Sequence, residues 1–324
     1  MTTVKDGLFQ YGGVAVGGPL SQGKSYHIKP GSGTSGAGGL KVNDAVSTVA
    51  RAHTLMTADQ NDVAYMYAED NSASGTTDYQ SSALTWSKDG THLIGVNSGG
   101  VVGQRSRIAQ LSTATGVSPL VTWSANNGSM RNIHVFHGVA DATSKIAVTV
   151  SGDRNYFYRN HFAGIGNATM DVATACSLNV QGDENLFEDC TIGLDTIARG
   201  AAATYEVLFD GGATRNIFRN CRFISYSEAA GFAFIARSTS GTDRWNLFQN
   251  CQFINMPTGD AGGTTMTEAF DVTAGGSPDG VFILDNCSLF GATDWENPVT
   301  GKVMIFAGTS TAATAGLGVD VAAS

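Results

Sequence analysis

One short phrase recurs along the chain at nearly constant spacing, and this repeat limits the possible folds more than any other feature. The phrase reads NLFEDCTI at 185–192, NIFRNCRF at 216–223, NLFQNCQF at 246–253 and FILDNCSL at 282–289. A unit of about 30 residues that contains no helical pattern excludes helical repeat arrays, and it fits a coil of about three short strands. The sequence therefore predicts an all-β chain that forms a single solenoid, a parallel β-helix.

Equivalent residues of stacked coils line up along the axis at about 4.8 Å, so each position of the phrase forms a ladder. The aromatic residue of the phrase is expected to point into the coil. This ladder consists of Phe187, Phe218 and Phe248, with Tyr158 in the first copy and Leu284 in the last. The next ladder is expected in a tight bend, because Asn and Asp tolerate left-handed backbone there, and it holds Asp189, Asn220, Asn250 and Asn286, preceded by Asn160.

The cysteine of each copy follows the bend, at Cys190, Cys221, Cys251 and Cys287. His161 takes the cysteine position in the upstream copy NYFYRNHF. A ladder is a line, whereas metal ligands converge on a point, and a catalytic thiolate has to be exposed and activated. Disulfides along the ladder are the minor alternative, because parallel side chains would have to rotate out of the stack. Core packing is the favoured interpretation, since free Cys behaves as a small buried apolar residue.

The ends of the chain differ from the repeat. Residues 1–25 are rich in Gly and form either an arm that lies on a partner or an ordered lead-in. A capping helix is expected at about 43–57, with Asn43 or Asp44 as N-cap and His53 packed on its inner face. The β-helix is expected to span 26–300, and 301–324 a C-terminal strand and tail. No linker divides the chain into separate domains.

Composition limits the partners. Charged residues make up 15% of the chain and the net charge is −9, without a basic cluster, so direct binding of nucleic acid is not expected. No apolar stretch reaches the about 18 residues of a membrane span. The N-terminus lacks the pattern of a secretory signal, which predicts synthesis in a cytoplasm.

The repeats resemble the coils of right-handed parallel β-helix proteins of the pectate-lyase-like type. The opening, from SYHIKPGSGTSGAGG to NDVAYMYA, is similar to the strand, Gly-rich loop, capping helix and first coil of that superfamily. More narrowly, DGLFQYGGVAVGGPLSQGKSYHIKPGSG, NDVAYMY and LTWSKDGTHLIGV resemble virion-associated proteins of tailed bacteriophages. That resemblance implies a structural role on the particle, on its head.

Many β-helices cleave polysaccharides, so an enzymatic role is the competing interpretation. Carboxylates recur just before the phrase and basic residues accompany them, namely Asp153, Asp183 and Asp243 with Arg154, Arg215 and Arg244. Solvated turns with local hydrogen bonds are the favoured interpretation of these residues. No catalytic, cofactor-binding or metal-binding residue is predicted, and no cofactor.

The expected function is that of a non-enzymatic capsid decoration or cement protein on the outer capsid surface, made in the host bacterial cytoplasm. Its expected partners are the major capsid protein, other virion proteins and further copies of itself, as a homotrimer. The alternative is a receptor-binding or polysaccharide-binding tailspike-like protein, with or without depolymerase activity. Copy number per particle and release of oligosaccharides would separate the two.

Overall fold

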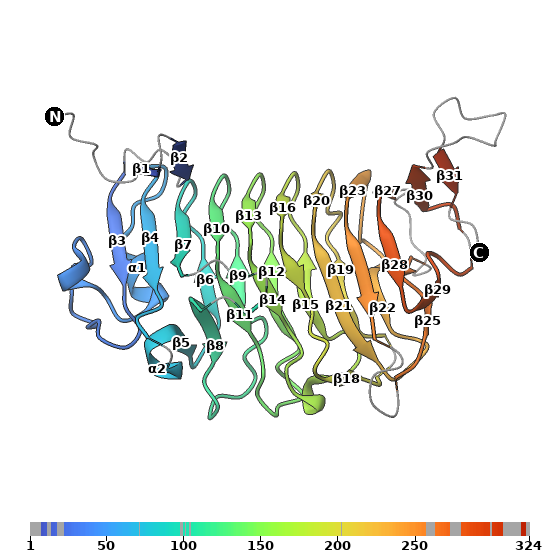
Figure 1. The fold of residues 1–324 in the computed structure, drawn as a ribbon, viewed down its shortest axis with the longest axis horizontal. Coiled ribbons are helices and arrows are strands. Elements are labelled where there is room, and N and C mark those ends of the chain that lie inside the picture. The colour runs from blue at the N-terminus through green and yellow to red at the C-terminus, as the bar shows by residue number, and fades with distance from the viewer. Residues whose placement is uncertain are drawn as a thin grey trace.

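The computed structural model describes residues 23–70, 72–97, 100, 102–103, 105–201, 203–256, 263–272, 280–298 and 300–306, and the backbone of 8–11, 14–17 and 319–321. Within these ranges the chain winds into one right-handed parallel β-helix, whose coils follow one another along a rod from the N-terminal to the C-terminal end (Figure 1). The fold predicted from the repeat is therefore confirmed.

Three parallel sheets form the wall of the rod. The first sheet contains, in order along the axis, β3 (Ser25–Ile28), β4 (Val63–Tyr67), β7 (His92–Val96), β10 (Ser129–Arg131), β13 (Tyr156–Tyr158), β16 (Leu186–Glu188), β20 (Ile217–Arg219), β23 (Trp245–Gln249), β27 (Val281–Asp285) and β30 (Val303–Phe306). Strand β31 (Val319–Val321) pairs antiparallel with β30 at the end of this sheet.

The second sheet follows the tight bend of each coil. It contains β5 (Thr77–Gln80), β8 (Arg107–Gln110), β11 (His134–Phe136), β14 (His161–Ala163), β17 (Thr191–Ile192), β21 (Arg222–Ser227), β24 (Gln252–Asn255) and β28 (Ser288–Phe290), and β18 (Ala198–Arg199) pairs with β21.

A longer loop then leads to the third sheet. It contains β6 (Leu84–Trp86), β9 (Val121–Trp123), β12 (Ile146–Val150), β15 (Cys176–Val180), β19 (Tyr205–Phe209), β22 (Ala233–Arg237) and β26 (Phe270–Asp271). Near the C-terminal end of the rod, β25 (Met266–Glu268) pairs with β29 (Ala292–Asp294).

The capping helix is shorter than the sequence predicted. Helix α1 spans Val49–Leu55, and the Thr48 side chain caps it by accepting from the Arg51 amide at 3.2 Å. Neither expected N-cap is used, because Val46 forms a parallel bridge with Ile28 and holds the chain extended before the helix. Asn43 and Asp44 lie instead in the 3₁₀ turn η1 (Val42–Asp44).

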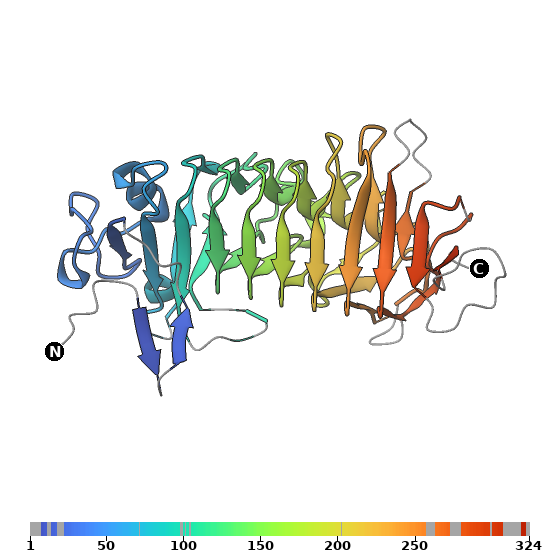
Figure 2. The same cartoon turned by 90° about the horizontal axis from the view of Figure 1, so that it is seen from above.

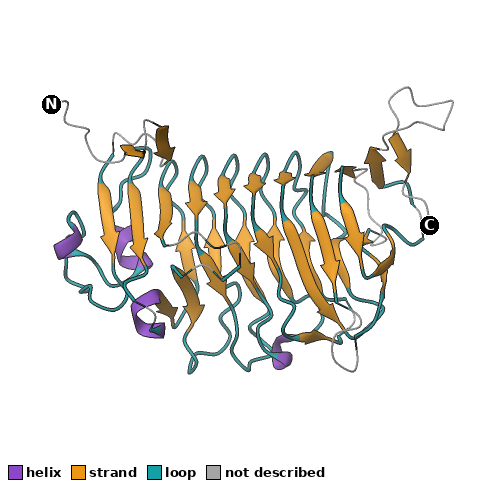
Figure 3. Ribbon diagram, in the orientation of Figure 1, coloured by secondary structure: helices purple, strands orange, loops and turns teal. Residues whose placement is uncertain are grey.

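The other helical segments are single turns. They are α2 (Ala73–Thr76) and η2 (Ala168–Met170), and Figure 3 shows helical turns mainly at the N-terminal end of the rod. His53 on α1 packs as expected, since its ring lies 4.9 Å from that of Trp86 and its Nε2 accepts from the Ser87 amide at 3.1 Å. The helix therefore closes the first coils with contacts to the core rather than with a binding site.

The ends of the chain lie largely outside the described residues. Within the expected arm, the backbone of β1 (Leu8–Tyr11) and β2 (Val14–Gly17) forms an antiparallel hairpin beside the rod (Figure 2). The expected tail contributes β30 and the backbone of β31. No helix in the described part of the chain is long and apolar enough to span a bilayer.

Candidate functional site

The bend after the first sheet uses the same backbone conformation in successive coils. Asp189, Asn220, Asn250 and Asn286 have φ between 51° and 53°, the left-handed region that Asn and Asp tolerate. Between two of them the amides also pair along the axis, since Asn286 Nδ2 donates to Asn250 Oδ1 at 2.8 Å. The bend fixes which residues of the phrase point inward and which point outward.

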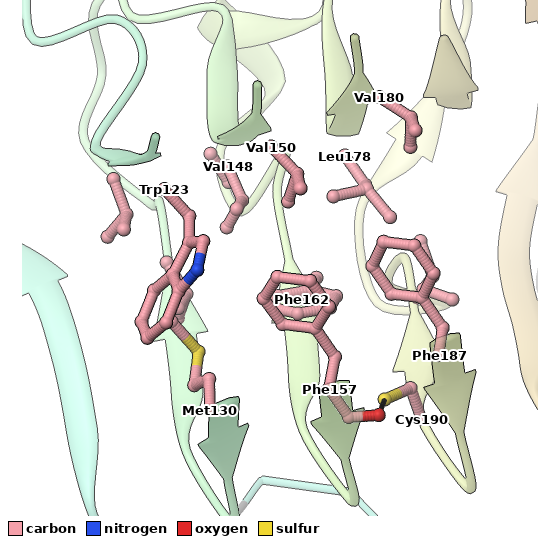
Figure 4. Packing of buried hydrophobic residues seen from close by; sticks show 14 of the residues in the cluster. Trp123, Met130, Val148, Val150, Phe157, Phe162, Leu178, Val180, Phe187 and Cys190 are labelled. Atoms are coloured by element: carbon pink, nitrogen blue, oxygen red, sulfur yellow. Dashed lines mark hydrogen bonds between the residues drawn. The ribbon is translucent and has the colours of Figure 1, made fainter. Parts of the chain in front are cut away.

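Inward, the phenylalanines form a continuous stack. The ring centroids of Phe187 and Phe218 are 4.5 Å apart and those of Phe218 and Phe248 are 4.8 Å apart, with the rings nearly parallel. Phe157 extends the stack at 4.7 Å from Phe187, and Leu284 continues it beyond Phe248 by strand pairing. Figure 4 shows the start of this ladder among the valines of the third sheet. Each of the four phenylalanines is fully buried, so the ladder is the core of the coil.

The repeat cysteines lie behind the bend as free thiols. Each Sγ donates to the main-chain carbonyl of the aromatic-ladder residue one coil earlier, as Cys190 does to Phe157 at 3.4 Å (Figure 4) and Cys251 to Phe218 at 3.3 Å. Burial raises the pKa of the Cys221 thiol. Cys287, in the last copy, is only half-buried. These thiols support the wall of the coil and lack the exposure that a nucleophile needs.

The register expected for the upstream copy is wrong by one residue. Phe157, not Tyr158, pairs with Phe187, and His161 pairs with Thr191 rather than taking the cysteine position. Asn160 occupies that position, and its Nδ2 donates to the Met130 carbonyl at 2.8 Å, as the thiols do in later coils. The left-handed bend residue of this coil is Arg159, with φ of 52°.

A second amide ladder, which the sequence interpretation overlooked, begins four copies of the phrase. It consists of the buried residues Asn155, Asn185, Asn216 and Asn246. Asn216 Nδ2 donates to Asn246 Oδ1 at 3.0 Å and to the Gly182 carbonyl at 3.1 Å, and Asn216 Oδ1 accepts from the Asn185 amide at 2.9 Å. The signal was the first letter of the phrase, which is Asn in the copies at 155, 185, 216 and 246.

The outer face of the first sheet carries a row of uncharged, mostly apolar side chains. The apolar stripe consists of the half-buried residues Tyr156, Leu186, Ile217, Leu247, Ile283 and Met304, which are Cα partners on successive strands. In the four full copies of the phrase, the stripe residue directly precedes the inward Phe or Leu. A row of this kind on the solvent side of a sheet is a candidate contact surface.

Charges on either side of the stripe are paired within the chain. On one side, Glu184 contacts Arg154 at 2.6 Å and Arg215 at 2.5 Å. On the other side, Arg219 lies 3.6 Å from Glu188. All of these side chains are partly exposed, so each pair contributes at most about 1 kcal/mol. Their effect is to leave the flanks of the stripe nearly neutral.

Two of the three aspartates that recur just before the phrase hydrogen-bond to the turn of the next coil. Asp153 Oδ1 accepts from the Asp183 amide at 2.8 Å, and Asp183 Oδ1 accepts from the Thr214 amide at 3.0 Å. Burial, with the nearby Asp153 charge as a smaller cause, raises the pKa of Asp183. The side chains of Arg154 and Arg215 pair with Glu184 rather than with these aspartates. Asp153 and Asp183 therefore each join one coil to the next, whereas Asp243 and Arg244 are exposed.

A groove of about 310 Å³ lies on the outer face of the second sheet, over β5, β8 and β11. Tyr79 at its edge is 45% exposed, and the Arg107 guanidinium lies 5.9 Å from the centroid of the Phe136 ring. Gln110 Oε1 is buried without a hydrogen-bond partner in the described part of the chain. An exposed aromatic surface beside a cation can bind a polar ligand, whereas the Gln110 oxygen is too buried for a ligand to reach.

Two stacked imidazoles lie beside this groove. The rings of His134 and His161 are 4.6 Å apart, and His134 Nδ1 accepts from Arg107 Nε at 3.1 Å. His161 Nδ1 accepts from the Gly103 amide at 3.0 Å, and its Nε2 donates to the Gly193 carbonyl at 2.9 Å. Burial lowers the pKa of His161 to about 4, so the ring is neutral near pH 7. His161 thus anchors the loop before β8 at Gly103, and His134 holds Arg107, the first residue of β8.

Two further charged groups lie toward the C-terminal half of the rod. Arg199 pairs with Asp171 at 2.8 Å and with Glu206 at 3.1 Å, and all three side chains are at most 6% exposed. Burial first, and then the charges of Asp271 and nearby carboxylates, raise the pKa of Glu268 to about 7. Among the described residues, no group of three or more His, Cys, Asp or Glu side chains is arranged to hold a metal ion.

Comparisons with known proteins support the fold alone. No protein-family model matches the chain, and no curated protein matches it. Among solved structures, a pectate lyase is similar with a TM-score of 0.61 at 15% identity, covering 89% of this chain and 69% of that one. A pectin methylesterase in complex with a hexasaccharide gives 0.56 at 17% identity, covering 89% and 91%. A deglycosylated pectin methylesterase from Aspergillus niger gives 0.55 at 16% identity, covering 89% and 81%. The chain thus shares the right-handed β-helix with these enzymes.

Proposed function

We propose that the chain is a structural, non-enzymatic protein of a tailed-bacteriophage particle, and that it decorates the outer surface of the capsid. The observation that carries this proposal is the apolar stripe on the first sheet. The resemblance of the opening segment to virion-associated proteins gives the biological setting. The partners are the major capsid protein and further copies of the chain.

The stripe is long enough to be an adhesive surface. Its six strands succeed one another at about 4.8 Å, which gives a length of about 24 Å. Only 15% of the residues are charged, and the charges beside the apolar row are already paired within the chain. Such a row suits a protein contact that depends on complementary shape and on burial of apolar surface. In this proposal residues 1–25 or 301–324 contact the shell, and the stripe joins copies of the chain on it.

The carboxylates of the coil argue for the same function. Asp153 and Asp183 bind main-chain amides of neighbouring coils, and Glu184 is held between two arginines. A glycosidase or lyase needs carboxylates that are free to face a sugar. These side chains are committed to holding the coil together.

Reconstruction of the intact particle tests the proposal. We expect density for the rod on the head shell and a copy number per particle in the hundreds. Density confined to the tail, with tens of copies or fewer, would contradict a decoration role. Quantitative mass spectrometry of purified particles provides the copy number independently of the density.

A second candidate function is receptor or polysaccharide binding, and the groove beside Tyr79, Arg107 and Phe136 is the observation that favours it. Incubation with host polysaccharide would show binding to the wild-type chain and weaker binding to Arg107→Gln. Arg222→Gln, on the same outer row of the second sheet but away from the groove, is the matched control. Released oligosaccharides would indicate depolymerase activity.

A further inference from the structure

We propose that the apolar stripe binds a second copy of this chain in antiparallel orientation. The two-fold axis would run along the strand direction and pass between β16 and β20. This inference rests on the proposed function in one respect, that the stripe is a protein contact, and it names the partner. The order of the charges along the two flanks of the stripe favours this orientation.

In this arrangement the first sheets of the two copies pack face to face, and the distance between the sheets is about 10 Å, as is usual for stacked sheets. Reversal about the axis places β16 over β20 of the second copy and β13 over its β23. Leu186 then faces Ile217 of the second copy, and Tyr156 faces its Leu247. Each stripe residue from Tyr156 to Leu247 thereby meets an uncharged partner.

On the flank that follows the stripe, the same axis places residues of opposite charge from the two copies face to face. Its members lie two residues after the stripe residues from Tyr156 to Ile283, with Arg131 in the same row on β10. They are Arg131, Tyr158, Glu188, Arg219, Gln249 and Asp285, all half-buried. Read backwards, this row places Arg219 of the second copy opposite Glu188, and Asp285 of the second copy opposite Arg131. The two neutral members, Tyr158 and Gln249, face each other.

The flank that precedes the stripe behaves in the same way. Two residues before Leu186 and Ile217 lie Glu184 and Arg215, so the axis places the glutamate of one copy opposite the arginine of the other. Arg154, one coil earlier, faces the uncharged Trp245. Neither flank brings two like charges together between β10 and β27, and the stripe between them is uncharged.

Other packings of the same face bring like charges of the two copies together. Parallel copies related by an axis along the stripe would place Glu188 opposite Glu184 and Arg219 opposite Arg215, in the same layers. An antiparallel axis through β20 itself would place Arg219 against Arg219. Like charges at a partly buried contact suppress an association. A trimer of parallel copies, expected from capsid symmetry, would therefore have to use another face.

Sedimentation of the purified full chain tests the association. We expect a species of twice the 33.6 kDa chain mass that dissociates on dilution. Ile217→Glu should abolish the dimer, because it places a carboxylate against Leu186 of the second copy. Ile224→Glu, half-buried on the outer face of the second sheet in the same coil, should leave the dimer intact. A wild-type chain that stays monomeric would overturn the inference.

Thiol cross-linking tests the orientation, because facing Cα atoms about 10 Å apart are too far for a direct disulfide. Tyr156→Cys and Leu247→Cys proteins are treated, separately and as a mixture, with a short bismaleimide that spans about 10 Å. Strands β13 and β23 are three coils apart, about 14 Å, so antiparallel copies cross-link 156 to 247 but neither position to itself. We expect a covalent dimer in the mixture alone. Dimers formed by each protein separately would indicate parallel packing and overturn the inference. Either failure leaves the capsid location, which is decided by particle reconstruction, unaffected.

Discussion

The inner and outer sides of the first sheet carry different patterns of residue types, although the same short strands form both sides. On β20, Phe218 stacks inward on identical rings above and below, and its neighbours Ile217 and Arg219 point outward. Inward positions repeat one residue type because each coil is the packing partner of the next. Outward positions keep one uncharged row between flanks whose charges pair along the axis within the chain. The paired charges are explained within the chain, so the uncharged row is the part of the outer pattern that a contact outside the chain would explain.

The largest expected effect is on the inner side. Phe218→Ala removes a fully buried ring between two stacked neighbours, and we expect the free energy of unfolding to fall by about 3–5 kcal/mol. Chemical denaturation measures this change. Ile217→Ala, the adjacent outward residue, is the control and should cost less than about 1 kcal/mol. Equal losses for the two variants would remove the distinction between the sides.

The next effect concerns the buried amide ladder. Asn216→Ala leaves the Asn185 amide and the Gly182 carbonyl without their partner, and an unpaired buried polar group costs about 1–3 kcal/mol. Asn220→Gly, at the exposed bend, is the control, because glycine accepts its left-handed backbone. A variant of Asn216 as stable as the wild type would show that the amide ladder only fills space.

The thiol ladder should matter less. Cys251→Ala removes a weak S–H donor to the Phe218 carbonyl and a small apolar group, and we expect a loss of about 1 kcal/mol. Alkylation of the native protein should modify the half-buried Cys287 first and the three buried repeat cysteines slowly. Rapid modification of all four would be incompatible with their place behind the bend.

The smallest effect on stability is expected on the outer side. Ile217→Glu should change the free energy of unfolding of the monomer by about 0.5 kcal/mol or less, since Arg215 and Arg219 flank the new carboxylate. Denaturation is measured at concentrations where the wild type is dissociated. A large loss of monomer stability would mean that the stripe belongs to the core, and the comparison of the two sides would fail.

Much of the coil could be predicted from the sequence because its determinants lie within one phrase. The inward Phe and the bend at Asp189 and Asn220 are set by short-range geometry, and stacking copies those contacts from coil to coil. The upstream copy was misaligned because its bend falls on Arg159, a residue type that rarely adopts positive φ. The register is decided by the inward packing of Phe157. The expected register instead aligned Asn160 with the bend asparagines of the later copies.

The outer surfaces were harder to predict, for a physical reason. The groove combines Tyr79, Arg107 and Phe136 from three coils that lack the phrase. The sequence repeat therefore does not predict it. The helix began later than expected because the pairing of Val46 with Ile28 outweighed local capping by Asn43. The stripe was visible as Leu or Ile before each inward residue, but its direction became clear only from the strand register.

The left-handed bend also makes each coil an exchangeable unit of length. Because successive coils turn at one residue with nearly the same φ, inserting or deleting a whole coil would preserve every inward ladder. The same change would move the midpoint of the outer charge series by half a layer. Rod length could therefore drift during evolution without harm to folding, while a change of one coil would alter which molecules recognise each other.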